Sequence, residues 1–270
     1  MDRQSEMQFG ETQLTGRAVV AITGADAAGF LQGLVTADVQ GLAEGQSAYA
    51  ALLTPQGKIL HDFFVLRRDA GFLLDVAAGQ LDSLVQRLGI YKLRAAVTIT
   101  GKPELNVIVS PEAGDYADPR TAAIGYRAMT ERTAAGPDGP YHAARIALGL
   151  ADSERDLGSG EYFPHEANLD QLGAVSFTKG CYVGQEVVSR MEHRGTARSR
   201  ILPVSVAGSA PAKGAAVEAG GKPVGTVLSS AGETALAILR LDRLHEATEP
   251  LLTEGRTVRV IKPDWARFEI

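Results

Sequence analysis

Apolar residues in the first 110 positions occur either as short runs or at helical spacing. The short runs, rich in β-branched residues, predict strands at 17–22, 49–54, 59–66, 72–76, 97–100 and 107–109. Helical spacing predicts two helices, one over 78–90 (Leu81, Leu84, Val85, Leu88) and one after Asp26 (Phe30, Leu31, Leu34, Val35). This order of elements predicts an α+β body in which helices pack on largely antiparallel sheets.

The middle of the chain has a weaker pattern. Residues 111–140 are rich in Pro, Gly, Ala and Asp and predict loops around a short strand at 124–129. A helix is expected at 142–149. Residues 150–180 are irregular and polar, and long ordered loops inside compact domains are often functional.

After Arg200 the pattern changes to short strands at regular intervals, with a Gly-Gly turn at 220–221. This pattern is typical of a small β-barrel or sandwich. We therefore predict an α+β region over 1–199 and a C-terminal β-barrel over 200–270.

Composition narrows the class of protein. The chain has 270 residues and one cysteine, so it cannot form an internal disulfide. Its net charge of −5 is unlike the positive charge of a dedicated nucleic-acid binder. No apolar run reaches the length of a membrane span. The N-terminal segment carries Asp2, Glu6 and Glu11 and does not resemble a targeting peptide. We expect a cytoplasmic protein with no direct nucleic-acid contact and no membrane contact.

The single cysteine, Cys181, lies in the stretch TKGCYVGQEVVSR. The spacing of Glu186 and Arg190 predicts a helix that begins near Gly184. A helix N-terminus and the neighbouring Lys179 both favour a thiolate, which suggests a reactive or metal-ligating thiol. A buried cysteine that packs as a small hydrophobe is the alternative.

Other polar residues suggest a ligand less strongly. Asp62 interrupts an apolar strand, so it either faces a ligand nitrogen or lies on a solvent-exposed face. Tyr91 and Arg94 suit an anionic ring-bearing ligand, or simply a solvated helix end. His165 has no second histidine at metal-binding spacing, so no dedicated metal site is expected.

Three stretches together resemble a known family. KGCYVGQE, preceded by YFPHEANLDQLGAVSFT and followed by VVSRMEHRG, resembles the signature of the YgfZ family, folate-binding relatives of the glycine cleavage T-protein (aminomethyltransferase). GADAAGFLQGLVTADVQGL and ALLTPQGKILHDFFV are also similar to that family. The resemblance covers most of residues 17–200.

The resemblance implies a T-protein-like fold of two interleaved α+β parts around a central channel, plus the C-terminal barrel. It implies tetrahydrofolate, or a related folate, as cofactor. It also implies a role in assembly or repair of iron–sulfur enzymes, including those that methylthiolate tRNA, with iron–sulfur carrier or client proteins as partners. Cys181 would be the functional thiol. The folate-contacting residues would be Asp62, Tyr91, Arg94, Lys179, Gly180, Gly184, Gln185 and Glu186.

The sequence also departs from the T-protein pattern. T-proteins carry two aspartates where this chain has His61 and Asp62, and a pterin-contacting glutamate where Ala147 is the nearest match. These differences favour an accessory protein. A folate-dependent aminomethyltransferase with Asp62 as its orienting carboxylate, and an interaction module with an empty channel, are the alternatives.

Overall fold

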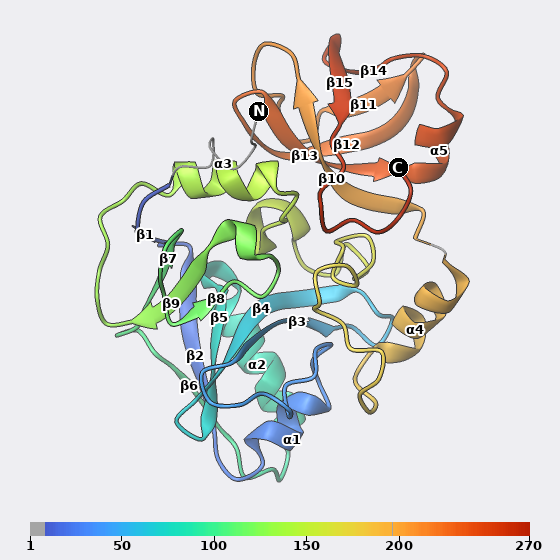
Figure 1. Cartoon of the computed structure of the whole chain (residues 1–270). Helices are drawn as coiled ribbons and strands as arrows, with labels where there is room; N and C mark the ends of the chain where they lie inside the picture. The colour runs from blue at the N-terminus through green and yellow to red at the C-terminus, as the bar shows by residue number, and fades with distance from the viewer. Residues whose placement is uncertain (1–8, 196) are drawn as a thin grey trace.

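Two antiparallel sheets and a closed barrel form the chain, which a computed structural model describes over residues 9–195 and 197–270 (Figure 1). The larger sheet has the order β3-β4-β5-β2-β6. Its strands are β2 (Arg17–Thr23), β3 (Ser47–Leu53), β4 (Ile59–Arg68), β5 (Gly71–Ala77) and β6 (Thr98–Gly101). Strands β3, β4 and β5 form a meander in which each strand pairs with the next.

Two helices, α1 (Ala27–Gln32) and α2 (Leu81–Lys92), cover one face of the larger sheet, and a short 3-10 turn, Ala78–Gln80, leads into α2. Helix α1 is shorter than its hydrophobic pattern predicts. Leu34 and Val35 lie beyond its end but are buried in the same core. The other face of the sheet is also covered, so β4 is buried on both faces. Its sequence is accordingly apolar over most of its length and lacks the alternation of apolar and polar residues seen in a half-exposed strand.

The smaller sheet has the order β1-β7-β9-β8. Its strands are β1 (Thr12–Gln13), β7 (Asn106–Ser110), β8 (Tyr116–Ala117) and β9 (Tyr126–Thr130), with a 3-10 turn at Ala122–Ile124. Helix α3 (Gly139–Ala147) packs Tyr141 and Ala144 into the hydrophobic core beneath the smaller sheet. Because β1 precedes the larger sheet in sequence and β7 follows it, the two α+β parts are interleaved, as predicted.

The C-terminal strands close into a six-stranded barrel of order β10-β13-β12-β11-β14-β15. The strands are β10 (Ser199–Val206), β11 (Ala216–Ala219), β12 (Lys222–Ala231), β13 (Thr234–Arg240), β14 (Leu251–Thr253) and β15 (Arg256–Val260). The short helix α5 (Leu241–Glu246), which the sequence pattern did not predict, follows β13. Leu202 and Val204 of β10 point into the barrel core, whereas Ile201 packs outward against the body.

A further core joins the body to the barrel. It includes Ile146 of α3, Leu228 and Leu236 of the barrel, Tyr182, and Val188 of helix α4 (Gln185–Arg194). The irregular segment that leads to α4 contains a single π-helical turn at Ser153–Leu157. The Cys181 loop therefore lies where the larger sheet, the irregular segment and α4 meet.

Candidate functional site

The side chain of Cys181 is exposed, so the alternative of a buried, purely packing cysteine is wrong. Its loop is held before the cysteine by the hydrogen bonds of Lys179, and after it by the burial of Tyr182 and of Val188 in α4. Helix α4 begins at Gln185, and Glu186 pairs with Arg190 at 2.6 Å across one helical turn, as the spacing predicts. An exposed thiol on a loop anchored at both ends can react or bind metal without unfolding.

Gly184 is the position in this loop where only glycine fits. Its φ is +82°, and a Cβ there would lie 2.6 Å from the carbonyl oxygen of Thr54. On the other side of the same contact, a Cβ at Gly57 would lie 2.9 Å from Cβ of Val187. The turn after β3 and the start of α4 are thus packed almost backbone to backbone. Gly180 differs, because a Cβ there would meet nothing within 4 Å.

Lys179 is half-buried and directs its amine away from the surface. Its Nζ donates to the carbonyl oxygens of Gln32, Val35 and Ala37 at 2.7, 2.5 and 2.8 Å. Desolvation lowers the pKa of Lys179 to about 8. These contacts give Lys179 a structural role at the end of α1 that the sequence did not indicate.

Asp62 is buried, so the solvent-facing alternative for this residue is wrong. Its Oδ2 accepts a hydrogen bond of 2.7 Å from the Tyr49 hydroxyl, and its Oδ1 has no hydrogen-bond partner among the described residues. Burial raises the pKa of Asp62, and the hydrogen bond from Tyr49 opposes that effect. His61 is also buried and pairs with Gln80.

Beside Asp62 lies a buried cluster of arginines and aspartates, which we call the ionic cluster; it comprises Arg17, Arg120, Arg127, Arg145, Asp75, Asp118, Asp152 and Asp156. The ion pairs are Arg17–Asp75 (2.6 Å), Arg127–Asp75 (2.5 Å), Arg120–Asp118 (2.8 Å), Arg127–Asp118 (3.5 Å) and Arg145–Asp156 (2.7 Å). Three of the aspartates form these ion pairs, and Asp152 adds a fourth negative charge close to Arg145 and Arg17, so the four arginines are matched by four aspartates. The sequence reasoning missed it, although Asp75 inside an apolar strand was a signal of the same kind as Asp62.

The arginines of the ionic cluster also pack on an aromatic ring. The guanidinium carbons of Arg127 and Arg120 lie 3.9 and 4.8 Å from the centroid of the Phe64 ring. Burial alone would lower the pKa of Arg127, but the charge of Asp75 raises it well above its ordinary value. Burial alone would raise the pKa of Asp118, but Arg120 lowers it. Both groups therefore stay charged and paired.

The residues around Asp62 do not fit a folate. The cavity that Asp62 lines, together with Arg17, Arg120 and Arg127, has a volume of about 10 Å³. A cavity of that size has room for about one water molecule, whereas small-molecule sites typically have roughly 300–1,000 Å³. A pterin ring beside Asp62 would have to displace charged side chains that are already paired with one another.

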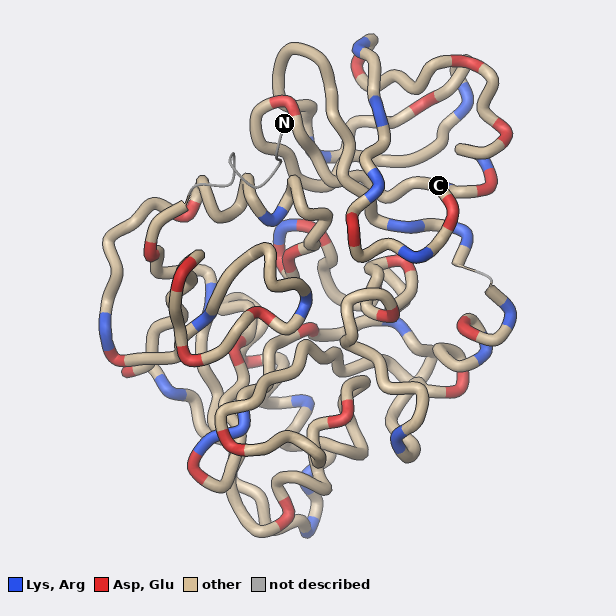
Figure 2. The backbone as a smooth tube through the Cα atoms, viewed as in Figure 1, with Lys and Arg blue, Asp and Glu red and all other residues tan. Residues whose placement is uncertain are grey.

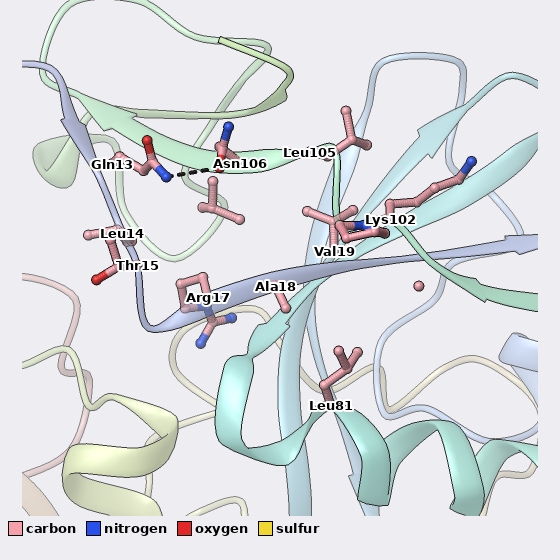
Figure 3. Close-up of a pocket in the computed structure, with 13 residues that line it drawn as sticks. Gln13, Leu14, Thr15, Arg17, Ala18, Val19, Leu81, Lys102, Leu105 and Asn106 are labelled. Carbon is pink, nitrogen blue, oxygen red and sulfur yellow. Dashed lines mark hydrogen bonds between the residues drawn. The ribbon is translucent and has the colours of Figure 1, made fainter. Parts of the chain in front are cut away.

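Tyr91 and Arg94 do not line the Asp62 cavity. Tyr91 packs against the core at the end of α2, and Arg94 is exposed. A second cavity, of about 250 Å³, lies between the two sheets, and Figure 3 shows Leu14, Leu81 and Lys102 around it. None of the predicted folate contacts lines this cavity. Asp62, Tyr91 and Arg94 therefore share neither of these two cavities. The other predicted folate contacts, Lys179, Gly180, Gly184, Gln185 and Glu186, lie together in the Cys181 loop and at the start of α4.

His165, Asp170 and Glu192 place one potential ligand atom each within 4.8 Å of one another. Asp170 is already bound by Arg200 through both of its oxygens, at 2.6 and 2.9 Å. Glu192 lies 3.1 Å from Nε2 of His165. The Arg200–Asp170 ion pair and the His165–Glu192 hydrogen bond thus hold the barrel and α4 to the preceding loop, and we do not interpret the group as a metal site.

Charged residues of both signs are interspersed over the backbone, as Figure 2 shows. Within residues 9–195 and 197–270, helices that combine the length and apolar character needed to cross a bilayer are absent.

Comparison with known proteins agrees with this architecture. Residues 10–105 match the family described as the GCVT N-terminal domain, and residues 198–268 match the CAF17 C-terminal beta-barrel domain. The crystal structure of glycine cleavage system aminomethyltransferase T from Bartonella henselae superimposes with a TM-score of 0.75 at 14% identity, covering 97% of this chain and 88% of that one. The fold is that of the T-protein-like class, with an appended six-stranded barrel.

Sequence relatives define the family more closely. Proteins named iron-sulfur cluster assembly factor IBA57, mitochondrial, from Mus musculus and from Homo sapiens are each 33% identical to this chain. Each match covers 94% of this chain and 84% of the relative. The chain belongs to the IBA57 family of T-protein-like proteins. The expected cytoplasmic location is wrong, because these relatives are named as mitochondrial proteins; residues 1–8, on which that expectation partly rested, lie outside the described residues.

Proposed function

We propose that this chain is an assembly factor for iron–sulfur proteins and that the thiol of Cys181 is its working group. The observation that carries the proposal is the exposure of the only cysteine in the sequence, on a loop anchored by Gly184 and Lys179. The relatives named as iron-sulfur cluster assembly factors support the same class of function.

The chemistry of a single thiol constrains how the protein works. A cysteine thiolate is the usual protein ligand of an iron–sulfur cluster, which normally takes four such ligands. One cysteine cannot complete that set, so the remaining ligands come from a partner. The cluster is cargo in this scheme, and the partner is an iron–sulfur carrier or client protein that contributes its own cysteines.

The proposal does not use tetrahydrofolate. The resemblance to folate-binding T-proteins favours a folate, but the paired arginines beside Asp62 leave a cavity of only about 10 Å³. The same observation counts against an aminomethyltransferase activity. We expect tetrahydrofolate at 1 mM to leave the melting temperature unchanged. A folate that bound with a micromolar dissociation constant would stabilise the chain by about 4 kcal/mol at this roughly thousandfold excess and would raise the melting temperature. A shift of several degrees would restore the folate role.

The thiol is tested by complementation. Cells that lack this gene receive the wild type, Cys181→Ala or the control Thr178→Ala, an exposed neighbour in the same loop. The readouts are the activity of an iron–sulfur enzyme and the methylthiolation of tRNA. We expect the wild type and the control to restore both, and Cys181→Ala to restore neither at equal protein abundance. Because Cys181 is exposed, its replacement changes the unfolding free energy by less than about 0.5 kcal/mol. Equal rescue by all three would refute the proposal.

A further inference from the structure

Lys179 occupies an unusual position for a surface lysine. Its amine lies among three backbone carbonyls, those of Gln32, Val35 and Ala37, at the C-terminal end of α1 and in the turn that follows. The last carbonyls of a helix have no partners within the helix, and a cation there is favourable. A lysine ammonium has three N–H donors and no acceptor, so these three carbonyls use all of them.

The chain just before Lys179 is fixed to the same region. The backbone N–H of Ser176 donates to the carbonyl of Thr36 at 2.9 Å, and the Thr36 hydroxyl donates to the carbonyl of Ala174 at 2.6 Å. The backbone N–H of Lys179 donates to the Ser176 hydroxyl at 3.2 Å. The segment 174–179 is therefore connected by hydrogen bonds to the residues that follow α1.

The chain after Cys181 is fixed to a different element. Gly184 packs against the carbonyl of Thr54, in the turn that follows β3. Cys181 thus lies between two anchors only five residues apart, Lys179 on the α1 side and Gly184 on the β3 side. The thiol itself is exposed.

We propose that Lys179 is a positioning residue, which fixes the backbone before Cys181 to the end of α1 so that the thiol is held at a defined place on the surface. This role replaces the one that the sequence suggests, in which the lysine charge activates the thiol. The inference rests on the proposed function only in that Cys181 is taken as the working group.

The test compares two properties of the purified, metal-free full chain: amide hydrogen exchange over residues 174–184 and the pH profile of Cys181 alkylation by iodoacetamide. The variants are Lys179→Met, which removes the donors, and Lys179→Arg, which keeps the charge but has a planar group. Lys102→Met, at a solvent-accessible lysine that pairs with Glu104, is the control.

For Lys179→Met we expect exchange over 174–184 to rise about tenfold or more, because hydrogen bonds from a charged donor are lost. We expect the midpoint of the alkylation profile to stay within about 0.3 pH units of the wild type. Lys179→Arg should also exchange faster, since a planar guanidinium does not match three converging carbonyls. The control should match the wild type in both measurements.

Two results would overturn the inference. An alkylation midpoint that rises by about one pH unit or more in Lys179→Met, with exchange unchanged and Lys179→Arg like the wild type, would show that the charge acts on the thiol. No change in either measurement would show that the lysine has neither role. Both measurements use protein without a cluster. A result that refutes the positioning role of Lys179 therefore leaves the proposed function standing, because that function is tested separately by Cys181→Ala.

Discussion

Replacing Gly184 with alanine tests the contact that joins the Cys181 loop to the turn after β3. Gly184 has φ +82°, a conformation that costs an L-residue about 1–2 kcal/mol. The added Cβ would lie 2.6 Å from the Thr54 carbonyl oxygen, closer than carbon and oxygen atoms tolerate. That carbonyl already accepts a hydrogen bond of 2.8 Å from Gly57, so it cannot move away without losing that bond. We expect a total loss of about 2–4 kcal/mol in the free energy of unfolding.

The assay is urea unfolding followed by circular dichroism, with Gly180→Ala as the matched control. Gly180 lies four residues earlier in the same loop, but a Cβ there meets nothing within 4 Å and its φ is outside the left-handed region. The control should change the unfolding free energy by less than about 0.5 kcal/mol. Equal losses for the two variants, or a loss below 1 kcal/mol for Gly184→Ala, would contradict the packing described here. Such a result would mean that the loop moves freely relative to the turn.

Two further predictions concern the buried charges. Arg127→Met leaves Asp75 and Asp118 short of a partner and should cost about 3–5 kcal/mol in urea unfolding, whereas Arg190→Met, which breaks an exposed helical pair, should cost about 0.5 kcal/mol or less; similar losses would show that the ionic cluster is not buried. Asp62 has a raised pKa in the folded chain, so the wild type binds an extra proton on folding and is stabilised through this group as the pH falls from 7 toward 4. Asp62→Asn lacks that gain, so its unfolding free energy relative to the wild type should fall over this range, by about 1.4 kcal/mol for each unit by which the pKa is raised; a difference independent of pH would refute the raised pKa.

The sequence predicted the fold well because most elements carry a local signal. The meander over β3, β4 and β5 and the helix α2 follow from apolar runs and helical spacing that the tertiary structure does not override. The two-residue strands β1 and β8 have no such signal, because their pairing is fixed by β7 and β9 and not by their own residues. Helix α5 was missed because its six residues are too few to show a period.

The candidate site was predicted less completely. The Cys181 loop and the start of α4 have a local sequence signal, and the structure places both as expected. The partners of Lys179 and of the ionic cluster are distant in sequence: Lys179 contacts carbonyls more than 140 residues away, and Arg127 pairs with an aspartate 52 residues away. No local pattern encodes such contacts.

The ionic cluster also bears on how the body unfolds. Arg17 and Asp75 belong to the larger sheet, and Arg127 belongs to the smaller one, so a single carboxylate is shared between them. If the sheets separated, the ion pair between Asp75 and Arg127 would break, and both charged groups would be left unpaired. Partial opening along this boundary is therefore unfavourable, and the two sheets form one cooperative unit, although neither is continuous in the sequence. Amides in β5 and β9 should accordingly exchange only in the same global event.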